Sequence, residues 1–250
     1  MKKKEFDYKK VAKEIGWSFA GAKYEVEYLS DYDYYKSVVA EISPETIMLD
    51  IGCGSAEKSL RYFLMAKSVY AIDNEREMLK KAKENAKKYY GENFDKWHFL
   101  EVDGNGELKF DDETFDLVVS RHCGANMNEV ARVLKKGGVF VSEDIADDDC
   151  IELKDFFGRG QAYKNEVPLD KKILNECYGA GFSKIELIKF EMNEFYKSKQ
   201  DLEYLLSRTP ILNVYDTNED GDVLDRYIEK FSTEKGILLR RRLFAFRLKK

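Results

Sequence analysis

Through the middle of the chain, short apolar runs alternate with longer segments whose apolar residues recur every three or four positions. The run at residues 46–51 lies between Pro44 and Gly52, which is typical of a buried strand. By the same criteria we predict strands at residues 46–51, 69–72, 97–102, 115–120 and 139–142, and helices at 59–66, 75–90 and 126–134, the last closed by Gly137 and Gly138. Strands that alternate with helices predict right-handed βαβ units and a parallel sheet.

Beyond residue 144 the alternation is less regular. The patterns there predict a helix at residues 169–179, a long alternating strand at 185–196 and a final strand at 243–248. Between the last two strands, residues 201–231 are predicted to form two helices joined by an acidic turn at 218–222.

Before the first strand, residues 2–42 show a helical pattern with small breaks and are rich in tyrosine. The tyrosine side chains either pack on the main domain or cover a ligand. Pro44 ends this segment, because the residue before a proline resists helix.

These elements predict an α/β fold. We expect a Rossmann-like, seven-stranded, mostly parallel sheet with helices on both faces, an antiparallel final strand, an N-terminal helical cap and a helical insertion before the last strand. The prediction is a single domain over residues 1–250. Its parts are a cap at 1–42, a Rossmann-like core at 43–196 and 241–250, and an insertion at 197–240 that covers a substrate.

Composition narrows the function classes. Hydrophobic residues make up 44% of the chain, which indicates a globular protein. The 42 basic and 47 acidic residues leave a net charge of −5, which disfavours a dedicated duplex DNA binder. We find no apolar run of the ~18 residues that a membrane helix needs, and no signal peptide. The four cysteines are scattered and there are two histidines, so we expect a cytoplasmic protein without a metal site.

The central motif is LDIGCGSA at residues 49–56, between a predicted strand and a predicted helix. Gly52 and Gly54 allow a sharp turn and the close approach of a ligand. Asp73, which ends the next predicted strand, can bind a ribose diol through two charge-assisted hydrogen bonds. Glu57 stands where a dinucleotide-binding loop has its third glycine, and its charge would repel a pyrophosphate. The loop therefore favours a nucleoside without phosphates over a nicotinamide cofactor.

Together with four further runs in order, this motif resembles the class I S-adenosylmethionine-dependent methyltransferases. The runs are AID at 71–73, Asp-Gly at 103–104, FDDETFDLVVS at 110–120 and VARVLKKGGVFVS at 130–142. The resemblance is close over about residues 45–145 and looser to Leu248. It implies S-adenosylmethionine as cofactor and S-adenosylhomocysteine as product.

The resemblance also implies site residues. The residues that would bind the cofactor are Asp50, Gly52, Cys53 and Gly54 at its methionine end, Asp73 at the ribose, Asn74 and Met78 beside the adenine, Asp103 at the adenine amino group, Gly104 where the adenine approaches, and Ser120 at the border of the methyl-transfer site.

Arg121 and His122 are the candidate catalytic residues, because they follow the fourth predicted strand, and proteins of this family bind their acceptor at that place. A histidine there can orient an acceptor or accept its proton, and the alternative is a packed or capping histidine. The pair resembles an Arg-His-Glu stretch of a poorly characterised bacterial subgroup, but this chain has Cys123 in place of the glutamate.

We therefore expect in-line methyl transfer to a small-molecule acceptor. The first alternative is an RNA methyltransferase. The residues 207–210 weakly resemble a stretch of ribosomal RNA guanine methyltransferases, whose cysteine zinc ribbon this sequence lacks, and the basic run 240–250 is either a phosphate patch or a strand. The second alternative is a non-catalytic S-adenosylmethionine-binding protein. The segment 155–163 is either a substrate loop or an ordinary surface loop, and the oligomeric state stays open.

Overall fold

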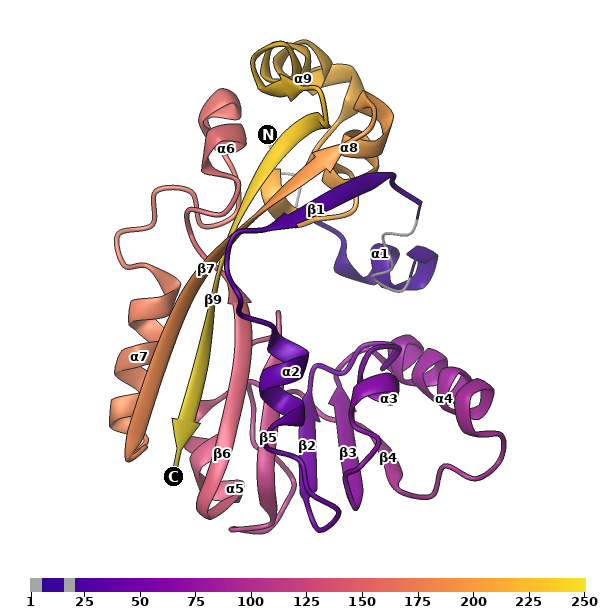
Figure 1. Cartoon of the computed structure of the whole chain (residues 1–250), viewed down its shortest axis with the longest axis vertical. Coiled ribbons are helices and arrows are strands. Elements are labelled where there is room, and N and C mark those ends of the chain that lie inside the picture. The colour runs from indigo at the N-terminus through magenta and orange to yellow at the C-terminus, as the bar shows by residue number, and fades with distance from the viewer. Residues whose placement is uncertain (1–5, 16–20) are drawn as a thin grey trace. The chain divides into compact units, whose positions relative to one another are not determined.

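A computed structural model describes residues 6–15 and 21–250. The part of the predicted cap at residues 1–5 and 16–20 lies outside the described residues. The strands form a nine-stranded sheet with the order β1-β7-β9-β6-β5-β2-β3-β4, and β8 pairs with β9 (Figure 1).

The strands are β1 (Tyr24–Tyr28), β2 (Ile47–Ile51), β3 (Ser68–Asp73), β4 (Trp97–Glu101), β5 (Phe115–Arg121), β6 (Leu134–Ile145), β7 (Lys184–Tyr196), β8 (Ser232–Thr233) and β9 (Gly236–Lys249). The helices are α1 (Tyr8–Ile15), α2 (Tyr34–Val39), α3 (Ser59–Tyr62), α4 (Arg76–Tyr90), α5 (Met127–Val133), α6 (Ile151–Phe157), α7 (Leu169–Gly179), α8 (Lys199–Leu206), the short 3-10 helix η1 (Pro210–Leu212) and α9 (Thr217–Phe231).

The described residues form two compact units. Unit 1 contains the residues up to Asp31 together with Ile145–Leu169 and Lys189–Leu243. Unit 2 contains Tyr32–Asp144, Asp170–Ile188 and Phe244–Lys250. The division of the chain into a cap, a core and an insertion stays a prediction.

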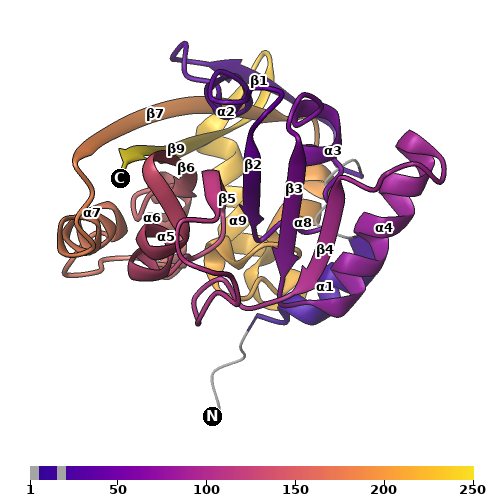
Figure 2. The same ribbon diagram turned by 90° about the horizontal axis from the view of Figure 1, so that it is seen from below.

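Unit 2 holds the parallel part of the sheet. β2 pairs in parallel with β3 and β5, β3 with β4, and β5 with β6. Leu117 and Val119 belong to a buried cluster with α2, α3 and α4, which cover one face of the sheet (Figure 2). Val118 points to the opposite face, where α5 lies, because side chains alternate along a strand. Each of these buried side chains contributes about 1.5–3 kcal/mol to folding.

The last strand runs antiparallel to β6, as predicted. In unit 2, the N–H of Gly137 donates to the carbonyl of Lys250 (3.1 Å), and the N–H of Lys250 donates to the carbonyl of Gly138 (3.0 Å). Gly137 and Gly138 therefore lie inside β6, and the prediction that they close the preceding helix is wrong. The helix already ends at Val133. A side chain at Gly138 would lie 2.9 Å from the carbonyl oxygen of Lys135, so close pairing explains that glycine.

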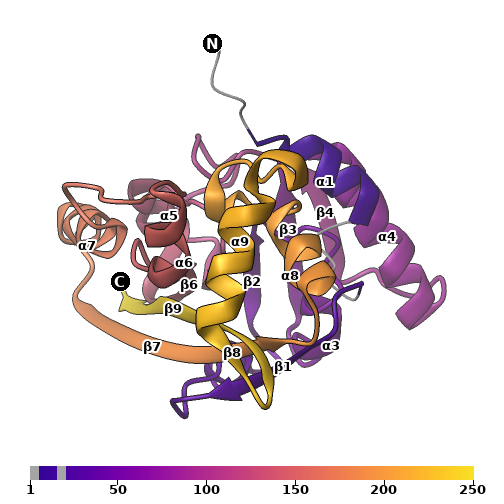
Figure 3. The same ribbon diagram turned by 90° about the horizontal axis from the view of Figure 1, so that it is seen from above.

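Unit 1 is built on the other halves of β7 and β9 and on β1. Its buried cluster contains Tyr196 and Leu239 from these strands, Leu153 from α6, and the apolar faces of α8 and α9. Figure 3 shows α8 and α9 beside each other. The tight cluster explains why the segment from α8 to α9 folds as helices.

Three local predictions need correction. Residues 24–28, predicted as helical cap, form the edge strand β1, because YEVEY alternates with a period of two. Residues 218–222, predicted as an acidic turn, form the first turn of α9, where Asp216 caps the helix and acidic side chains stabilise its N-terminus. The helix predicted at 59–66 is the single turn α3. With β1 and β8 the sheet exceeds the predicted seven strands.

Within the described residues, none of the helices is both long enough and apolar enough to span a membrane.

Candidate cofactor and acceptor site

The turn after β2 leaves the sheet sharply. Gly52 and Gly54 adopt φ values of +71° and +54°, which favour glycine. The N–H groups of Gly52 and Cys53 both donate to the carbonyl of Ile72 at 2.9 Å. A Cβ on Gly52 would lie 2.4 Å from Sγ of Cys123, so this turn lies directly against the loop after β5.

Asp73 ends β3 and holds this turn. Its Oδ2 accepts a hydrogen bond from the N–H of Gly54 and its Oδ1 accepts one from the N–H of Glu75, both at 2.8 Å. Burial raises the pKa of Asp73, and the backbone N–H bonds oppose that shift. Each oxygen keeps a second lone pair, so the fixed carboxylate can accept from two neighbouring hydroxyl groups.

Asp50 is buried in β2, and its Oδ2 accepts from the hydroxyl of Ser59 at 2.6 Å. Burial, opposed by the Ser59 bond and aided by the charge of Asp73, raises the pKa of Asp50 to about 7. A ligand cation near Asp50 would favour the ionised carboxylate. The positive end of a sulfonium cofactor with an ammonium group is chemically suited to this position.

The remaining predicted cofactor residues lie around this turn. Met78 is buried in α4, and its Cε would lie 3.4 Å from a Cβ on Gly54. Asn74 and Asp103 are exposed, and Oδ1 of Asp103 accepts from the N–H of Asn105 at 2.9 Å. A Cβ on Gly104 would lie 2.3 Å from Cγ2 of Ile51, so close packing against β2 requires this glycine.

Ser120 is buried at the end of β5, and its hydroxyl donates to the carbonyl of Cys123 at 2.7 Å. That bond closes the turn that presents Arg121 and His122. His122 adopts a left-handed backbone with φ of +53°, and its N–H donates to the carbonyl of Glu143 at 2.8 Å. A non-glycine residue in this conformation costs about 1–3 kcal/mol and is held by its surroundings.

Glu143 brings the two candidate catalytic side chains together. Arg121 Nε lies 2.8 Å from Glu143 Oε1, and His122 Nε2 lies 3.3 Å from the same oxygen. Burial raises the pKa of Glu143, but the His122 hydrogen bond and the Arg121 charge outweigh burial and lower it overall. The carboxylate is therefore ionised near neutral pH. Sequence reasoning missed Glu143; its signal was an acidic residue directly after the predicted strand 139–142.

Two tyrosines of α2 flank Arg121. The guanidinium carbon of Arg121 lies 6.0 Å from the ring centre of Tyr34 and 5.7 Å from that of Tyr35. Tyr35 also stacks on Tyr62 with ring centres 4.4 Å apart. Tyr34 is buried in the core of unit 2, so packing accounts for that residue, whereas Tyr35 is only partly buried.

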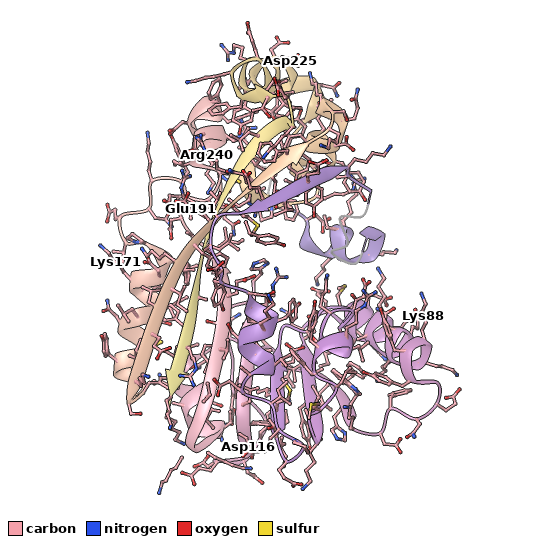
Figure 4. The ribbon with its side chains drawn as sticks, in the orientation of Figure 1. Lys88, Asp116, Lys171, Glu191, Asp225 and Arg240 are labelled. Atoms are coloured by element: carbon pink, nitrogen blue, oxygen red, sulfur yellow. The ribbon has the colours of Figure 1, made fainter. Side chains whose placement is uncertain are left out.

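The opposite ends of these strands carry ion pairs. Asp116 near the start of β5, marked in Figure 4, pairs with Lys135 at 2.8 Å and accepts from the N–H of Ile47 at 2.9 Å. The predicted site residues therefore gather at one edge of the parallel sheet.

Three other candidate segments make contacts within unit 1, the basic run 240–250 through its first residues. In the segment 155–163, Nη2 of Arg159 lies 2.8 and 2.7 Å from the two carboxylate oxygens of Asp220. In the basic run, Arg240, shown in Figure 4, pairs with Glu152, and Arg241 lies between the carboxylates of Asp149 and Glu194. In the segment 207–210, Arg208 stacks on Tyr204. These four arginine side chains are therefore engaged in internal contacts.

Among the residues that the structure covers, no group of three or more histidine, cysteine or acidic side chains is arranged to hold a metal ion.

A family of methyltransferase domains matches residues 42–209 of the chain. The chain therefore belongs to this family, and it is a class I S-adenosylmethionine-dependent methyltransferase. A comparison with curated proteins finds no match.

Solved structures share the fold. The YcgJ protein from Bacillus subtilis has a TM-score of 0.62 and 18% identity, over 86% of this chain and 95% of that one. A functionally unknown protein from Deinococcus radiodurans R1 has a TM-score of 0.60 and 17% identity, over 96% and 97%. Phosphoethanolamine N-methyltransferase 2 from Haemonchus contortus, solved with S-adenosylhomocysteine, has a TM-score of 0.51 and 16% identity, over 86% and 52%.

Proposed function

We propose that this chain binds S-adenosylmethionine at the carboxyl ends of β2, β3 and β4 and methylates a small-molecule acceptor. The observation that carries the proposal is the hydrogen bond between Asp73 and Gly54, because it fixes a carboxylate beside the glycine turn, at the sheet edge where open α/β folds bind ligands. The raised pKa of buried Asp50 supports a cationic ligand at the same edge.

In this proposal each group of residues binds a different part of the cofactor. Gly52, Cys53 and Gly54 line its methionine end together with Asp50. Asp73 accepts hydrogen bonds from the ribose hydroxyls. Asn74, Met78, Asp103 and Gly104 surround the adenine, and Ser120 supports the turn beside the methyl-transfer site. When bound, S-adenosylmethionine supplies a methyl group activated by its sulfonium for in-line displacement.

Arg121 and His122 then contact the acceptor. Positioning of two reacting groups lowers a barrier by about 7–11 kcal/mol, and a well-placed acid or base adds a factor of roughly 10²–10⁴. A small acceptor is favoured over RNA because Arg240, Arg241 and Arg242 are engaged by carboxylates of unit 1.

The test is thermal unfolding with S-adenosylmethionine, with S-adenosylhomocysteine and with NAD. A ligand at 100 times its Kd adds about 2.7 kcal/mol, which raises Tm by roughly 5–10 °C in a domain of this size. We expect this rise with the two sulfur nucleosides alone. A rise with NAD, or none with either sulfur nucleoside, contradicts the proposal.

A further inference from the structure

One buried carboxylate oxygen orients both candidate catalytic side chains. Oε1 of Glu143 lies 2.8 Å from Arg121 Nε and 3.3 Å from His122 Nε2. Arg121 and Glu143 are partners across the parallel strands β5 and β6, so the pairing is built into the sheet register. The Glu143 side chain is 7% exposed, whereas those of Arg121 and His122 are 40% and 35% exposed. The carboxylate is therefore hidden, and the groups that it holds reach solvent.

The contact with Glu143 determines which nitrogen of His122 carries the proton. An ionised carboxylate only accepts hydrogen bonds, so the nitrogen that faces it, Nε2, is the donor. In neutral imidazole, Nδ1 then carries the lone pair. Within the described part of the chain, no group is hydrogen-bonded to Nδ1. His122 thus presents a proton acceptor.

Arg121 places a permanent positive charge beside this acceptor. Its Nε is bound to Glu143, its guanidinium lies near the rings of Tyr34 and Tyr35, and among the described residues its two Nη groups have no hydrogen-bond acceptor. A guanidinium held in this way stabilises negative charge that develops on a nearby oxygen.

We propose, resting on the proposed function, that Glu143 is a positioning residue and that the acceptor is a molecule with an ionisable hydroxyl group, a phenol or an enol. His122 Nδ1 takes the hydroxyl proton, and Arg121 stabilises the oxyanion. The oxygen–methyl bond forms as the methyl–sulfur bond breaks, and the electron pair of the broken bond stays on sulfur. Atoms and charges balance without a further reactant.

The same groups disfavour an amine acceptor. Methylation of an amine builds positive charge on nitrogen, which the neighbouring guanidinium of Arg121 repels. A neutral amine also needs no base before it attacks, and a thiol ionises near neutral pH with little help. A hydroxyl gains from both the base and the cation, which is why we assign it as the methylated group.

The first test reads the tautomer of His122 and needs neither cofactor nor acceptor. The chain has two histidines, so ring-nitrogen NMR of the full chain labelled with ¹⁵N-histidine gives two sets of signals, and His98→Gln assigns them. We expect neutral His122 to carry its proton on Nε2. Glu143→Ala, which removes the acceptor, is expected to abolish that preference, whereas the matched control Glu41→Ala, which removes the partner of Arg247, leaves it intact.

A proton on Nδ1 in the wild-type chain, or no change in Glu143→Ala, overturns the proposal. Calorimetry with S-adenosylhomocysteine on the same samples separates the hypothesis on His122 from the hypothesis on the cofactor. Normal binding with the wrong tautomer rejects this inference alone, and absent binding with the expected tautomer rejects the proposed cofactor alone.

The second test is methyl transfer to matched pairs of phenols and anilines, together with enols and thiols. We expect transfer to a phenol or an enol, lowered about 10²–10⁴-fold by His122→Gln. In Glu143→Gln we expect a lower kcat and a changed pH profile, because the base is no longer oriented. Transfer to an aniline or a thiol in preference to the matched hydroxyl compound, or to no hydroxyl compound at all, overturns the hydroxyl class.

Discussion

Asp73 and Gly54 are joined by a hydrogen bond of 2.8 Å between the Asp73 carboxylate and the Gly54 N–H, so the end of β3 fixes the turn after β2. Because the same carboxylate also accepts from the N–H of Glu75, its orientation is set before any ligand arrives. Preorganisation of this kind lowers the entropic cost of binding.

Asp73→Ala removes both the fixed turn and the ribose acceptor. Hydrogen bonds to a charged group are worth about 1.5–3 kcal/mol, so we expect S-adenosylhomocysteine to bind roughly 10–100-fold more weakly. Titration calorimetry measures the effect. Asp112→Asn, which removes a carboxylate from an exposed ion pair with Arg132, serves as the control and is expected to bind normally. Equal affinity of Asp73→Ala and the wild-type chain would remove this residue from the site.

Gly52→Ala tests the contact between the two loops of the site. The new Cβ would lie 2.4 Å from Cys123 Sγ and would impose a φ of +71° on alanine. We expect a loss of about 1–3 kcal/mol in unfolding free energy from the backbone alone, with a further loss from the clash. Adding Cys123→Gly should relieve the clash and restore that part of the unfolding free energy, whereas the loss from the backbone conformation should remain. Gly179→Ala is the control, because nothing lies within 4 Å of its Cβ position. Urea unfolding compares the three variants with the wild-type chain, and identical stability of Gly52→Ala and Gly179→Ala would disprove the argument.

Local patterns predicted the parallel part of the sheet. Its strands appear as short apolar runs, and the buried apolar residues of its helices recur every three or four positions. The helix at Leu169–Gly179 was predicted with its observed bounds. The edge strand β1 was missed because its short alternating run lies within a longer segment of helical pattern, while the partners that stabilise Glu25 and Glu27, Lys197 and Lys235, lie far along the chain. Such partners are invisible to a local pattern.

The glycine turn and Asp73 were predicted because each follows a buried strand, and the structure places them in contact. Glu143 was missed for a different reason. Its role depends on the register between β5 and β6, which sets Arg121 opposite Glu143. The neighbouring strand thereby supplies a carboxylate to His122. Only the three-dimensional pairing reveals this contact.

Asp220→Ala tests whether the segment 155–163 is anchored. The buried carboxylate of Asp220 pairs with Arg159 and accepts from the N–H of Asp216 at 2.9 Å. Loss of these bonds should destabilise the chain by about 1–3 kcal/mol, measured by urea unfolding. Asp222→Ala, in the same helical turn region, is the control. We expect S-adenosylhomocysteine affinity to stay unchanged, and a large loss of affinity would instead support a substrate loop.

Asp50→Asn tests the electrostatics of the cofactor edge through pH. The pKa of Asp50 is about 7 in the folded chain, against about 4 in an unfolded one. Between these values the folded state holds a proton that the unfolded state has lost, so the wild-type chain loses stability as pH rises from about 4 to 7. Asparagine imitates the protonated carboxyl and should not show that loss. The difference in unfolding free energy between Asp50→Asn and the wild-type chain should therefore grow by up to about 4 kcal/mol across this interval and stay constant above it. Urea unfolding at several pH values between 4.5 and 8.5 measures this difference. All other groups titrate alike in the two proteins, so their contributions cancel. A difference that does not vary with pH would show that the pKa of Asp50 is not raised in the folded chain.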